Sequence, residues 1–590
     1  MFQPNYDKYP SVHVSDRRDD CLTGWDTICG EIERQLQNTH SSRLPQKGKI
    51  VVIECYQGVN EDEITGALRQ YFPDAALFLS SSAMKTEAEI DSFFYNDITE
   101  DEVFGFMTRY NIDSYFDDDK TALLRRKINV CEGLTFVIGT GAAYLCDCPD
   151  VLIYADMARW EIQLRFRRNE VGNVGVRNKK ERASLQYKRA FFVDWRICDR
   201  FKKCLFARMD YVLDTNVAGQ PKMIARKWFE KGLQNAVNQP FRVVPFFDPG
   251  PWGGQWMKAV CDLDKETVNY AWCFDCVPEE NSLLLRFGEI TVEIPSIDLV
   301  FAHPHELLGE AVHGRFGDEF PIRFDFLDTM QGGNLSLQVH PLTEYIQEKF
   351  GLHYTQDESY YMLDTGDDAC VYLGLKEGVH PEEMLACLRE AQTTGAFDAE
   401  RFVGKYPVGK HDHVLIPAGT VHCSGANSMV LEISATPYIF TFKLWDWGRL
   451  GLDGRPRPIN IGHGERNIQW NRTESWVRRE ILHCVEPVAE GDGWREERTG
   501  LHEREFIETR RHWFTKPVLH HTGGGVNVLN LVEGREAVVE SPSGVFEPFV
   551  VHYAETFIVP AAVGEYLIRP FGESDGKECA TIKAYVRNNS

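Results

Sequence analysis

Three short stretches decide the fold of the second half of this chain: LSLQVHP at residues 335–341, ESYYML at 358–363 and HVLIPAGTVH at 413–422. Each is a short run of apolar and alternating residues, and Pro and Gly break the third run, as expected where a strand meets a turn. A further apolar run, VLEISAT at 430–436, follows the last stretch closely. Short strands separated by turns are typical of an all-β barrel or sandwich.

Four polar side chains in these stretches form a candidate metal site. Gln338 and His340 are two apart in a predicted strand, so they point to the same face. Glu358 begins the next strand, and His422 follows the Pro and Gly turn. Two imidazoles with a carboxylate and an amide oxygen suit zinc, manganese, iron or cobalt and differ from a structural thiolate zinc site. Spacing alone also permits four unrelated core or surface side chains.

The same stretches, taken in order, resemble the class I mannose-6-phosphate isomerases, which are zinc-dependent proteins of the cupin fold. The resemblance extends over more than half of the chain. It includes GPWGGQWM at 250–257, FPIRFDFLDTMQGGNLSLQVHP at 320–341, VLEISATPYIFTFKLWDWGR at 430–449, and a second barrel suggested by LNLVEG at 529–534 and ETFIVPAAVGEYLI at 555–568. It implies that Gln338, His340, Glu358 and His422 bind one metal ion, zinc in the family. The implied reaction interconverts mannose 6-phosphate and fructose 6-phosphate through a cis-enediol.

The resemblance also assigns roles around the metal. Glu432 matches a Glu that lines the family's pocket, and we expect it to handle the proton. Lys443 stands where the family usually has an active-site Arg, and it is expected to stabilise the enediolate. Arg449 is a further catalytic candidate, although WDWGR at 445–449 also fits a structural ion pair. The expected substrate-binding side chains are Trp252, Arg323 and Arg457.

Three cationic neighbours of the family's site are altered in this chain. Lys443 replaces an Arg, and an ammonium is a point charge where a guanidinium can clamp a phosphate with two parallel hydrogen bonds. Gln356 and Asp325 stand at positions that commonly carry Lys. The protein therefore either binds a phosphosugar through Lys443, Arg449, Arg457 or Arg323, or has a pocket retuned for another sugar, perhaps one without phosphate.

The first half of the chain has a different pattern. KIVVIECYQGVNEDEITGALRQYF at 49–72 is a buried-type strand, a turn and a helix, and strands alternating with helices predict a doubly wound parallel sheet. This unit resembles the P-loop nucleoside kinase fold, with Gly58 where the phosphate-binding loop would lie. ECYQGVNEDEIT at 54–65 has one glycine, no Lys and three consecutive acids, so phosphoryl transfer is not expected.

Basic residues gather farther along the same unit. Arg159 lies near the end of the strand LIYA, where open α/β sheets bind ligands, and it belongs to a run that is basic in an otherwise acidic protein. The alternative is a set of solvated helix faces and structural ion pairs.

Composition limits the remaining possibilities. The chain has 590 residues, a hydrophobic share of 43% and a formal charge of −24, which predict several packed domains and exclude nonspecific nucleic-acid binding. The 16 cysteines form no pair of CxxC knuckles and are expected to be reduced thiols in a cytoplasmic protein. The first twenty residues lack a secretory signal, and no apolar run is long enough to span a membrane.

These observations predict a multidomain fusion of an α/β domain with an all-β double cupin. The predicted boundaries are an extension at 1–47, the kinase-like domain at 48–215, a linker at 216–240, a catalytic cupin at 241–470 with a helical insertion around 380–405, and a second cupin at 471–590. The alternatives are a cupin enzyme for a different sugar and a noncatalytic, metal- and sugar-binding regulatory protein. An active fusion of a sugar kinase with the isomerase is disfavoured by the altered loop. The oligomeric state is not predicted.

Overall fold

A computed structural model describes residues 4–38, 48–500, 502–503 and 505–587 of the 590. The chain divides into two compact units. The β unit comprises residues 1–10, 236–281 and 303–590, and the α/β unit comprises residues 11–235 and 282–302. The prediction of a multidomain chain is confirmed.

The α/β unit is built on one seven-stranded sheet with the order β2-β8-β7-β6-β3-β5-β4. The five strands from β4 to β7 are parallel, and β8 and β2 are added antiparallel at one edge. The central strands are continuous apolar runs that are almost completely buried, as expected when helices cover both faces. The strands are β2 (Cys21–Thr23), β3 (Lys49–Cys55), β4 (Ala76–Leu79), β5 (Leu134–Gly139), β6 (Val151–Asp156), β7 (Tyr211–Asp214) and β8 (Lys222–Ala225).

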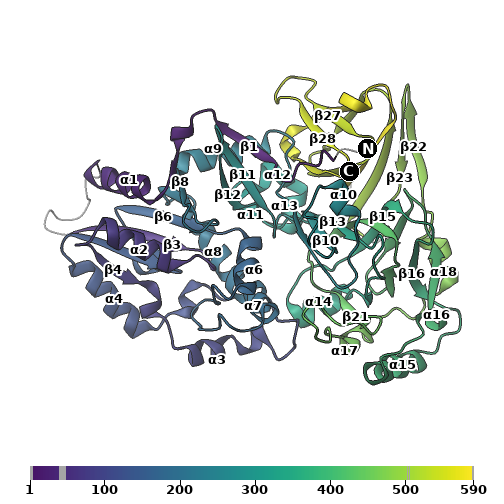
Figure 1. Ribbon diagram of the computed structural model, residues 1–590, viewed down its shortest axis with the longest axis horizontal. Coiled ribbons are helices and arrows are strands. Elements are labelled where there is room, and N and C mark those ends of the chain that lie inside the picture. The colour runs from purple at the N-terminus through teal and green to yellow at the C-terminus, as the bar shows by residue number, and fades with distance from the viewer. Residues whose placement is uncertain (1–3, 39–47, 501, 504, 588–590) are drawn as a thin grey trace. The chain divides into compact units, whose positions relative to one another are not determined.

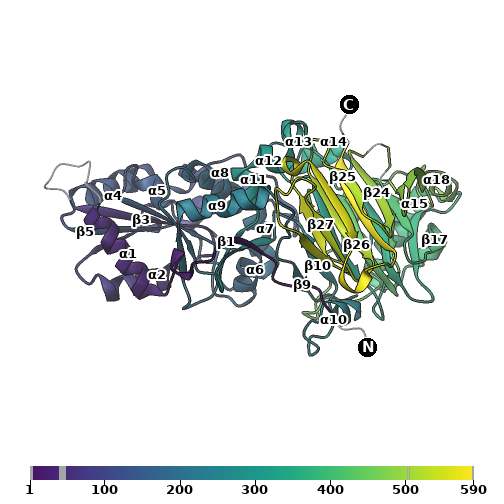
Figure 2. The ribbon, with the colours of Figure 1, turned by 90° about the horizontal axis from the view of Figure 1, so that it is seen from above.

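Helices lie on both sides of this sheet. Figure 2 shows α1 and α2 on one side and α4, α5 and α8 on the other. The predicted doubly wound arrangement is therefore present. The helices are α1 (Trp25–Asn38), α2 (Glu61–Tyr71), α3 (Glu87–Ile98), α4 (Asp118–Val130), α5 (Ala142–Leu145), α6 (Arg159–Arg167), α7 (Ala183–Arg189), α8 (Trp195–Leu205) and α9 (Arg226–Val237).

Two segments enter the α/β unit from outside the predicted boundaries. β1 (Ser11–Ser15) pairs parallel with β11 (Ser282–Phe287), which forms a hairpin with β12 (Ile290–Pro295). Helix α11 (Ile297–Ala302) follows this hairpin. Residues 1–47 thus contain regular structure, including β1, β2 and α1, and residues 216–240 contain β8 and all of α9. The structural division differs from the predicted boundaries because the β1–β11 pairing joins segments about 270 residues apart, which no local pattern reveals.

The β unit contains two β-sandwiches. In the first, a six-stranded sheet with the order β18-β15-β20-β13-β10-β9 accompanies a five-stranded sheet with the order β17-β16-β19-β14-β21. Its strands are β9 (Phe246–Asp248), β10 (Trp272–Cys276), β13 (Ile322–Asp328), β14 (Leu337–Val339), β15 (Glu358–Thr365), β16 (Cys370–Leu375), β17 (Val403–Pro407), β18 (His413–Ile416), β19 (His422–Ser424), β20 (Ser428–Ala435) and β21 (Phe442–Trp445). Almost every residue of β13 and β20 is buried, because both faces of these strands are covered.

Short helices surround the first sandwich (Figure 1). The predicted helical insertion corresponds to α15 and α16. The helices of the β unit are α10 (Trp256–Val260), α12 (Pro304–Leu308), α13 (Glu310–Phe316), α14 (Thr343–Phe350), α15 (Pro381–Thr394), α16 (Ala399–Phe402), α17 (Ile461–Gly464) and α18 (Glu474–Glu480). Among the described residues, none of the helices has both the length and the apolar character required of a membrane span.

The second sandwich forms from the C-terminal strands, which are yellow-green to yellow in Figure 1. A six-stranded sheet has the order β22-β23-β24-β31-β26-β29, and a four-stranded sheet has the order β25-β30-β27-β28. The strands are β22 (Glu486–Gly491), β23 (Trp494–Arg498), β24 (Ile507–Phe514), β25 (Val518–His521), β26 (Asn527–Glu533), β27 (Glu536–Glu540), β28 (Phe549–His552), β29 (Thr556–Val559), β30 (Glu565–Pro570) and β31 (Cys579–Val586).

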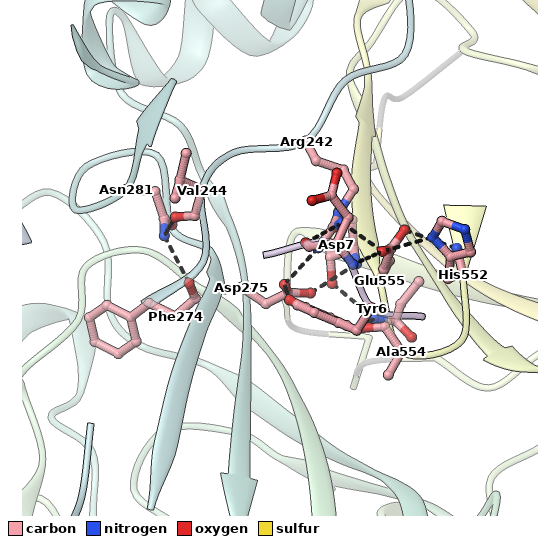
Figure 3. Close-up of polar contacts among 12 residues, drawn as sticks. Tyr6, Asp7, Arg242, Val244, Phe274, Asp275, Asn281, His552, Ala554 and Glu555 are labelled. Atoms are coloured by element: carbon pink, nitrogen blue, oxygen red, sulfur yellow. Dashed lines mark hydrogen bonds and ion pairs between the residues drawn. The ribbon is translucent and has the colours of Figure 1, made fainter. Parts of the chain in front are cut away.

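A buried charge network ties the N-terminal segment to both sandwiches (Figure 3). Arg242 contacts Glu555 at 2.8 Å and Asp275 at 3.7 Å. The Tyr6 hydroxyl donates to Asp275, and the Asp7 backbone N–H donates to Glu555 at 2.6 Å. Because Arg242, Asp275 and Glu555 are almost fully buried, removing one charge would leave its partners unpaired in the interior. The network therefore fixes the N-terminal segment in the β unit.

Candidate metal centre

Adjacent strands of the first sandwich bring the predicted ligands together. Gln338 on β14 pairs directly with His422 at the start of β19, and His340 follows two residues after Gln338. Glu358 begins β15, in the other sheet of the sandwich. The site therefore receives side chains from both sheets.

Three of these side chains form a compact buried cluster. The ligand atoms of His340, Glu358 and His422 all lie within 4.8 Å of one another, and the three side chains are completely buried. Glu358 Oε2 lies 2.9 Å from His340 Nε2, and Glu358 Oε1 lies 2.8 Å from His422 Nε2. In the described part of the chain, this is the only group of three or more His, Cys, Asp or Glu side chains close enough to hold a metal ion.

The backbone fixes the orientation of both imidazoles. Nδ1 of His340 lies 3.1 Å from the Phe440 carbonyl, and Nδ1 of His422 lies 2.8 Å from the Thr420 carbonyl. A carbonyl can only accept, so each Nδ1 carries a proton and each Nε2 faces the Glu358 carboxylate; in the neutral tautomer that binds a metal, the Nε2 lone pair points at this carboxylate. His340 Nε2 and Glu358 Oε1 have no hydrogen-bond partner among the described residues. Converging lone pairs repel one another, and a cation between them removes the repulsion, so this cluster fits a divalent metal.

Gln338 lies at the edge of the cluster. Its amide nitrogen is 3.2 Å from His422 Nε2. Amide oxygen and nitrogen are assigned from the surrounding hydrogen bonds, and turning the carboxamide over would direct its oxygen toward the cluster. Gln356 is placed beside Glu358 and donates to its Oε2 at 3.1 Å. Gln338 could therefore add an oxygen ligand, while Gln356 orients the carboxylate.

A second set of charged side chains lies on the neighbouring strands β13 and β20. Asp325 pairs with Glu432 and Arg323 pairs with Ser434, so all four side chains share one face. Arg323 forms an ion pair with Glu432, lies 3.4 Å from Asp325 and donates to the Ser434 hydroxyl at 2.8 Å. Burial raises the pKa of Asp325 to about 6, although Arg323 opposes this shift. Burial, with repulsion from Asp325, raises the pKa of Glu432 well above its usual range. Glu432 is thereby suited to exchange a proton.

Three cations lie beside the cluster, and two of them pair with a single carboxylate. Lys443 on β21 pairs with Gln338 across the sheet. Asp446 forms ion pairs with Arg449 and Arg457, both at 2.7 Å, and accepts a hydrogen bond from the Ser336 hydroxyl at 2.9 Å. Burial and the charge of Arg457 lower the pKa of Lys443 to about 7. No described residue forms a hydrogen bond or ion pair with the Lys443 amine, so the cations exceed the local negative charge.

The contacts that Trp252 makes in the structure are packing and backbone contacts. Its ring is buried against Trp272, with ring centroids 5.5 Å apart, and its carbonyl accepts from the Gly333 N–H at 2.9 Å. A side chain at Gly333 would come within 3.2 Å of Arg449. Trp252 therefore acts on the cationic group through packing of the loop that carries Gly333.

Sequence reasoning missed three residues near the site. Tyr360 is two residues beyond Glu358, pairs with Glu432 across the sheet and has its ring centroid 5.9 Å from that of His422. Ser336 is two residues before Gln338 and binds Asp446. The period of two would have found Tyr360 and Ser336, whereas Asp446 gave no signal apart from the motif WDWGR.

At the strand ends of the α/β unit, the charged groups pair internally. Glu54 accepts from the backbone of Gly141 and Ala143 at 2.6 and 2.8 Å. Asn60 caps α2 by accepting from two backbone N–H groups in its first turn, which are donors that a phosphate would need. The charged side chains Arg159 and Lys202 bind Asp199, Asp156 and Asp298. Structural ion pairs therefore account for Arg159, and the kinase-like character of this unit stays a prediction.

Comparison with known proteins relates the β unit to one enzyme family. The chain is 27% identical to the mannose-6-phosphate isomerase of Streptococcus mutans over 243 residues, which are 40% of this chain and 70% of that protein. It is 26% identical to the mannose-6-phosphate isomerase ManA of Bacillus subtilis over 253 residues, which are 42% of this chain and 72% of that protein. Over about 40% of its length, this chain is homologous to mannose-6-phosphate isomerases.

The crystal structure of the mannose 6-phosphate isomerase from Bacillus subtilis matches with a TM-score of 0.48 and 17% identity, over 59% of this chain and all of that one. A phosphomannose isomerase variant from Salmonella typhimurium matches with a TM-score of 0.45 and 14% identity, over 60% of this chain and all of that one. The N-terminal half matches a family described as a domain of unknown function (DUF8485), over residues 24–238.

Proposed function

We propose that this protein is a metal-dependent aldose–ketose isomerase that interconverts mannose 6-phosphate and fructose 6-phosphate. The observation that carries this proposal is the buried cluster of His340, Glu358 and His422, with both imidazoles fixed so that Nε2 faces the carboxylate. It lies in the part of the chain that is related to enzymes named for this reaction.

In the proposed enzyme, His340, Glu358 and His422 hold the metal and Gln338 completes the ligand set. A bound divalent ion, zinc in the resemblance and otherwise manganese, iron or cobalt, would supply Lewis acidity toward a substrate oxygen. The protein's own contribution starts with the two carbonyls that fix the imidazoles and with Gln356, which orients Glu358.

Glu432 is the proposed proton-transfer group. Isomerisation between C1 and C2 requires a group that removes a proton from one carbon and returns it to the other. The raised pKa of Glu432 allows both protonation states to be reached, and its contact with Arg323 restricts where the carboxylate points. Arg323 is a positioning residue in this proposal, because its Nε donates to Ser434 and one of its terminal nitrogens donates to Glu432.

The proposed site for the anionic part of the substrate consists of Lys443, Arg449 and Arg457. Arg449 and Arg457 share one counter-charge, Asp446, and no described residue forms an ion pair with Lys443, so the three cations together retain a net positive charge in a chain whose overall charge is −24. Guanidinium groups can bind a phosphate with two parallel hydrogen bonds. Lys443 adds a point charge beside Gln338 and can stabilise negative charge that develops on the substrate.

One observation favours a second candidate, an isomerase for a sugar without phosphate. Asp325 lies on the same face as Glu432 and adds a buried carboxylate where the related family commonly has Lys. A dianionic phosphate at this position would meet two carboxylates and one guanidinium. The same cluster would then act on a neutral sugar.

The test compares zinc-loaded protein with His422→Ala and with a matched control, His353→Ala, whose side chain is exposed. Formation of fructose 6-phosphate from mannose 6-phosphate and metal content are measured on all three. We expect His422→Ala to lose metal and activity together while His353→Ala keeps both. Wild-type protein that holds metal and converts mannose 6-phosphate no faster than buffer would refute the phosphosugar assignment, and unphosphorylated hexoses would then be assayed.

A further inference from the structure

The interior of the second sandwich changes character along its length. One end is an apolar core that includes Phe514, Leu529, Leu531, Val539 and Phe557. At the other end, the inward positions of the same strands carry polar and charged side chains. The polar group, called here the C-terminal polar cluster, comprises Glu496, His512, His520, Asn527, Tyr566 and Lys583.

Strand register places the members of this cluster on the inner face. His512 is two residues before the core residue Phe514, and Asn527 is two residues before Leu529. Lys583 pairs with Leu529, and Glu496 pairs with His512. His520 and Tyr566 pair with each other on the opposite, four-stranded sheet. Both sheets thus contribute polar groups to one end of the interior.

Several polar atoms of this cluster lack a partner within the described part of the chain. The rings of His512 and His520 are 4.4 Å apart, and His520 stacks on Tyr566 at 5.2 Å. Although Tyr566 donates to Asn527 at 2.9 Å, His512 Nδ1 and His520 Nε2 are buried and unbonded in the described part of the chain. Both imidazoles are 3% exposed. Buried polar atoms without partners are rare in native proteins, because each forfeits its hydrogen bonds to water.

Lys583 is also unpaired. Its amine lies 5.6 Å from the centroid of the Tyr585 ring, and no described residue forms a hydrogen bond or ion pair with it. The side chain is 9% exposed. Desolvation lowers the pKa of Lys583 to about 8, so at neutral pH most of the amines are charged and have three donors available.

The surroundings of the cluster are positively charged. Glu508 contacts Arg498 at 3.1 Å, Arg510 at 2.9 Å and Arg587 at 2.8 Å. Together with Lys583, these three arginines give four cations, whereas Glu508 and Glu496 give two carboxylates. If the exposed Glu486, 3.7 Å from Arg498, is included, the cations still outnumber the carboxylates; the buried Glu505, which interacts with Arg587, is not counted because burial raises its pKa well above its usual range. A local positive charge in a chain of net charge −24 attracts small anions.

We propose that the C-terminal polar cluster is a second ligand site that binds a small hydroxylated anion, with its carboxylate or phosphate oxygens on Lys583 and its hydroxyl groups on His512 and His520. The site is independent of the proposed isomerase function. A water molecule could satisfy the imidazole nitrogens, but water would leave the Lys583 charge without a counter-ion. An anion satisfies both needs.

The first experiment titrates the metal-loaded full chain with inorganic phosphate by calorimetry. Phosphate is also expected to bind the cations near Asp446, so two classes of site should appear. Arg457→Met should remove one class and Lys583→Met the other, whereas Lys583→Arg should keep both. A single class that Arg457→Met abolishes would overturn the second site and leave the isomerase proposal unaffected. No phosphate binding in the wild type would overturn the second site and also the assignment of the cations near Asp446 to the substrate phosphate.

The second experiment tests the imidazoles with glyceric acid, which carries both a carboxylate and hydroxyl groups. His520→Phe keeps the stacking on Tyr566 and removes the nitrogens. We expect it to weaken glycerate binding at the Lys583-dependent site at least fivefold while phosphate binding changes less than twofold. Equal losses for the two anions, or none for glycerate, would refute the role assigned to His520. Thermal melting of each variant verifies that it is folded.

Discussion

The two sandwiches of the β unit use their interiors in opposite ways. In the first, the polar side chains are held by their neighbours: carbonyls orient both histidines, Gln356 orients Glu358, and Arg323 holds Glu432. In the second, His512 and His520 each have a ring nitrogen without a hydrogen-bond partner among the described residues, and none of the described residues pairs with the Lys583 amine. Inward positions of a strand can therefore hold polar side chains that their neighbours fix in one orientation, as a catalytic group requires. They can also hold polar side chains whose hydrogen-bonding atoms are available to a ligand, and the surrounding contacts determine which case applies.

The largest expected effect is a loss of metal binding, which should follow from a substitution in the first sandwich and not from one in the second. Glu358→Gln keeps the size of the side chain but removes the charge that faces both Nε2 atoms. We expect zinc affinity to fall by more than about 100-fold, because loss of an outer contact to a ligand alone costs roughly 10–100-fold. His520→Phe in the other sandwich should leave zinc content unchanged. Metal analysis after dialysis against a chelator measures both, and equal retention by wild type and Glu358→Gln would contradict the assignment of this cluster.

The next effect concerns catalysis in the first sandwich. Glu432→Gln should lower kcat by roughly 10²- to 10⁴-fold, the usual contribution of a general acid or base, with little change in KM. Ser434→Ala removes one partner of Arg323 and should cause a smaller loss in kcat. Steady-state kinetics on mannose 6-phosphate give both numbers. A Glu432→Gln variant that alters KM alone would make this residue a binding group.

A third effect tests the apolar end of the second sandwich. Leu529 is completely buried in its core, beside Lys583 on the next strand. Leu529→Ala should lower the free energy of unfolding by about 2–5 kcal/mol, as is usual when a buried leucine is truncated. Chemical denaturation measures the change. A loss below about 1 kcal/mol would mean that this core collapses around the missing atoms.

The sequence was most informative where function depends on local spacing. Gln338 and His340 are two residues apart in a predicted strand, and the family resemblance of the stretches that carry Glu358 and His422 predicted that these side chains meet. That they bind a metal stays a prediction. The Arg323–Glu432 pair and the role of Asp446 depend on which strands are neighbours, which the sequence does not state.

The domain boundaries were harder to predict for a similar reason. Residues 282–302 belong to the α/β unit although the sequence on both sides belongs to the β unit. The pairing of β1 with β11 brings residues 282–302 into the α/β unit, and neither strand differs in composition from its surroundings. The C-terminal polar cluster was missed because its members come from separate strands whose register cannot be read from their spacing.

The smallest effect has an unusual sign, because Lys583→Met should stabilise the protein at neutral pH. Burial lowers the pKa of Lys583 to about 8 from the 10.5 that is usual for an exposed lysine, so between these values the unfolded chain binds more protons and stability rises with pH. Below pH 8 both states hold the proton and the full cost remains. At about 1.4 kcal/mol per pKa unit, that cost is at most about 3 kcal/mol.

Lys583→Met removes this cost, so the gain in the free energy of unfolding should be largest at pH 7 and vanish above about pH 10.5. Lys577→Met, at an exposed position, is the matched control and should change stability little. Denaturation curves at pH 7 and pH 10.5 without added phosphate supply the comparison. A variant less stable than wild type at pH 7 would mean that the amine has a stabilising partner. A gain confined to neutral pH would instead mean that the second sandwich keeps a destabilising charge in its interior, as a ligand site requires and a purely structural domain does not.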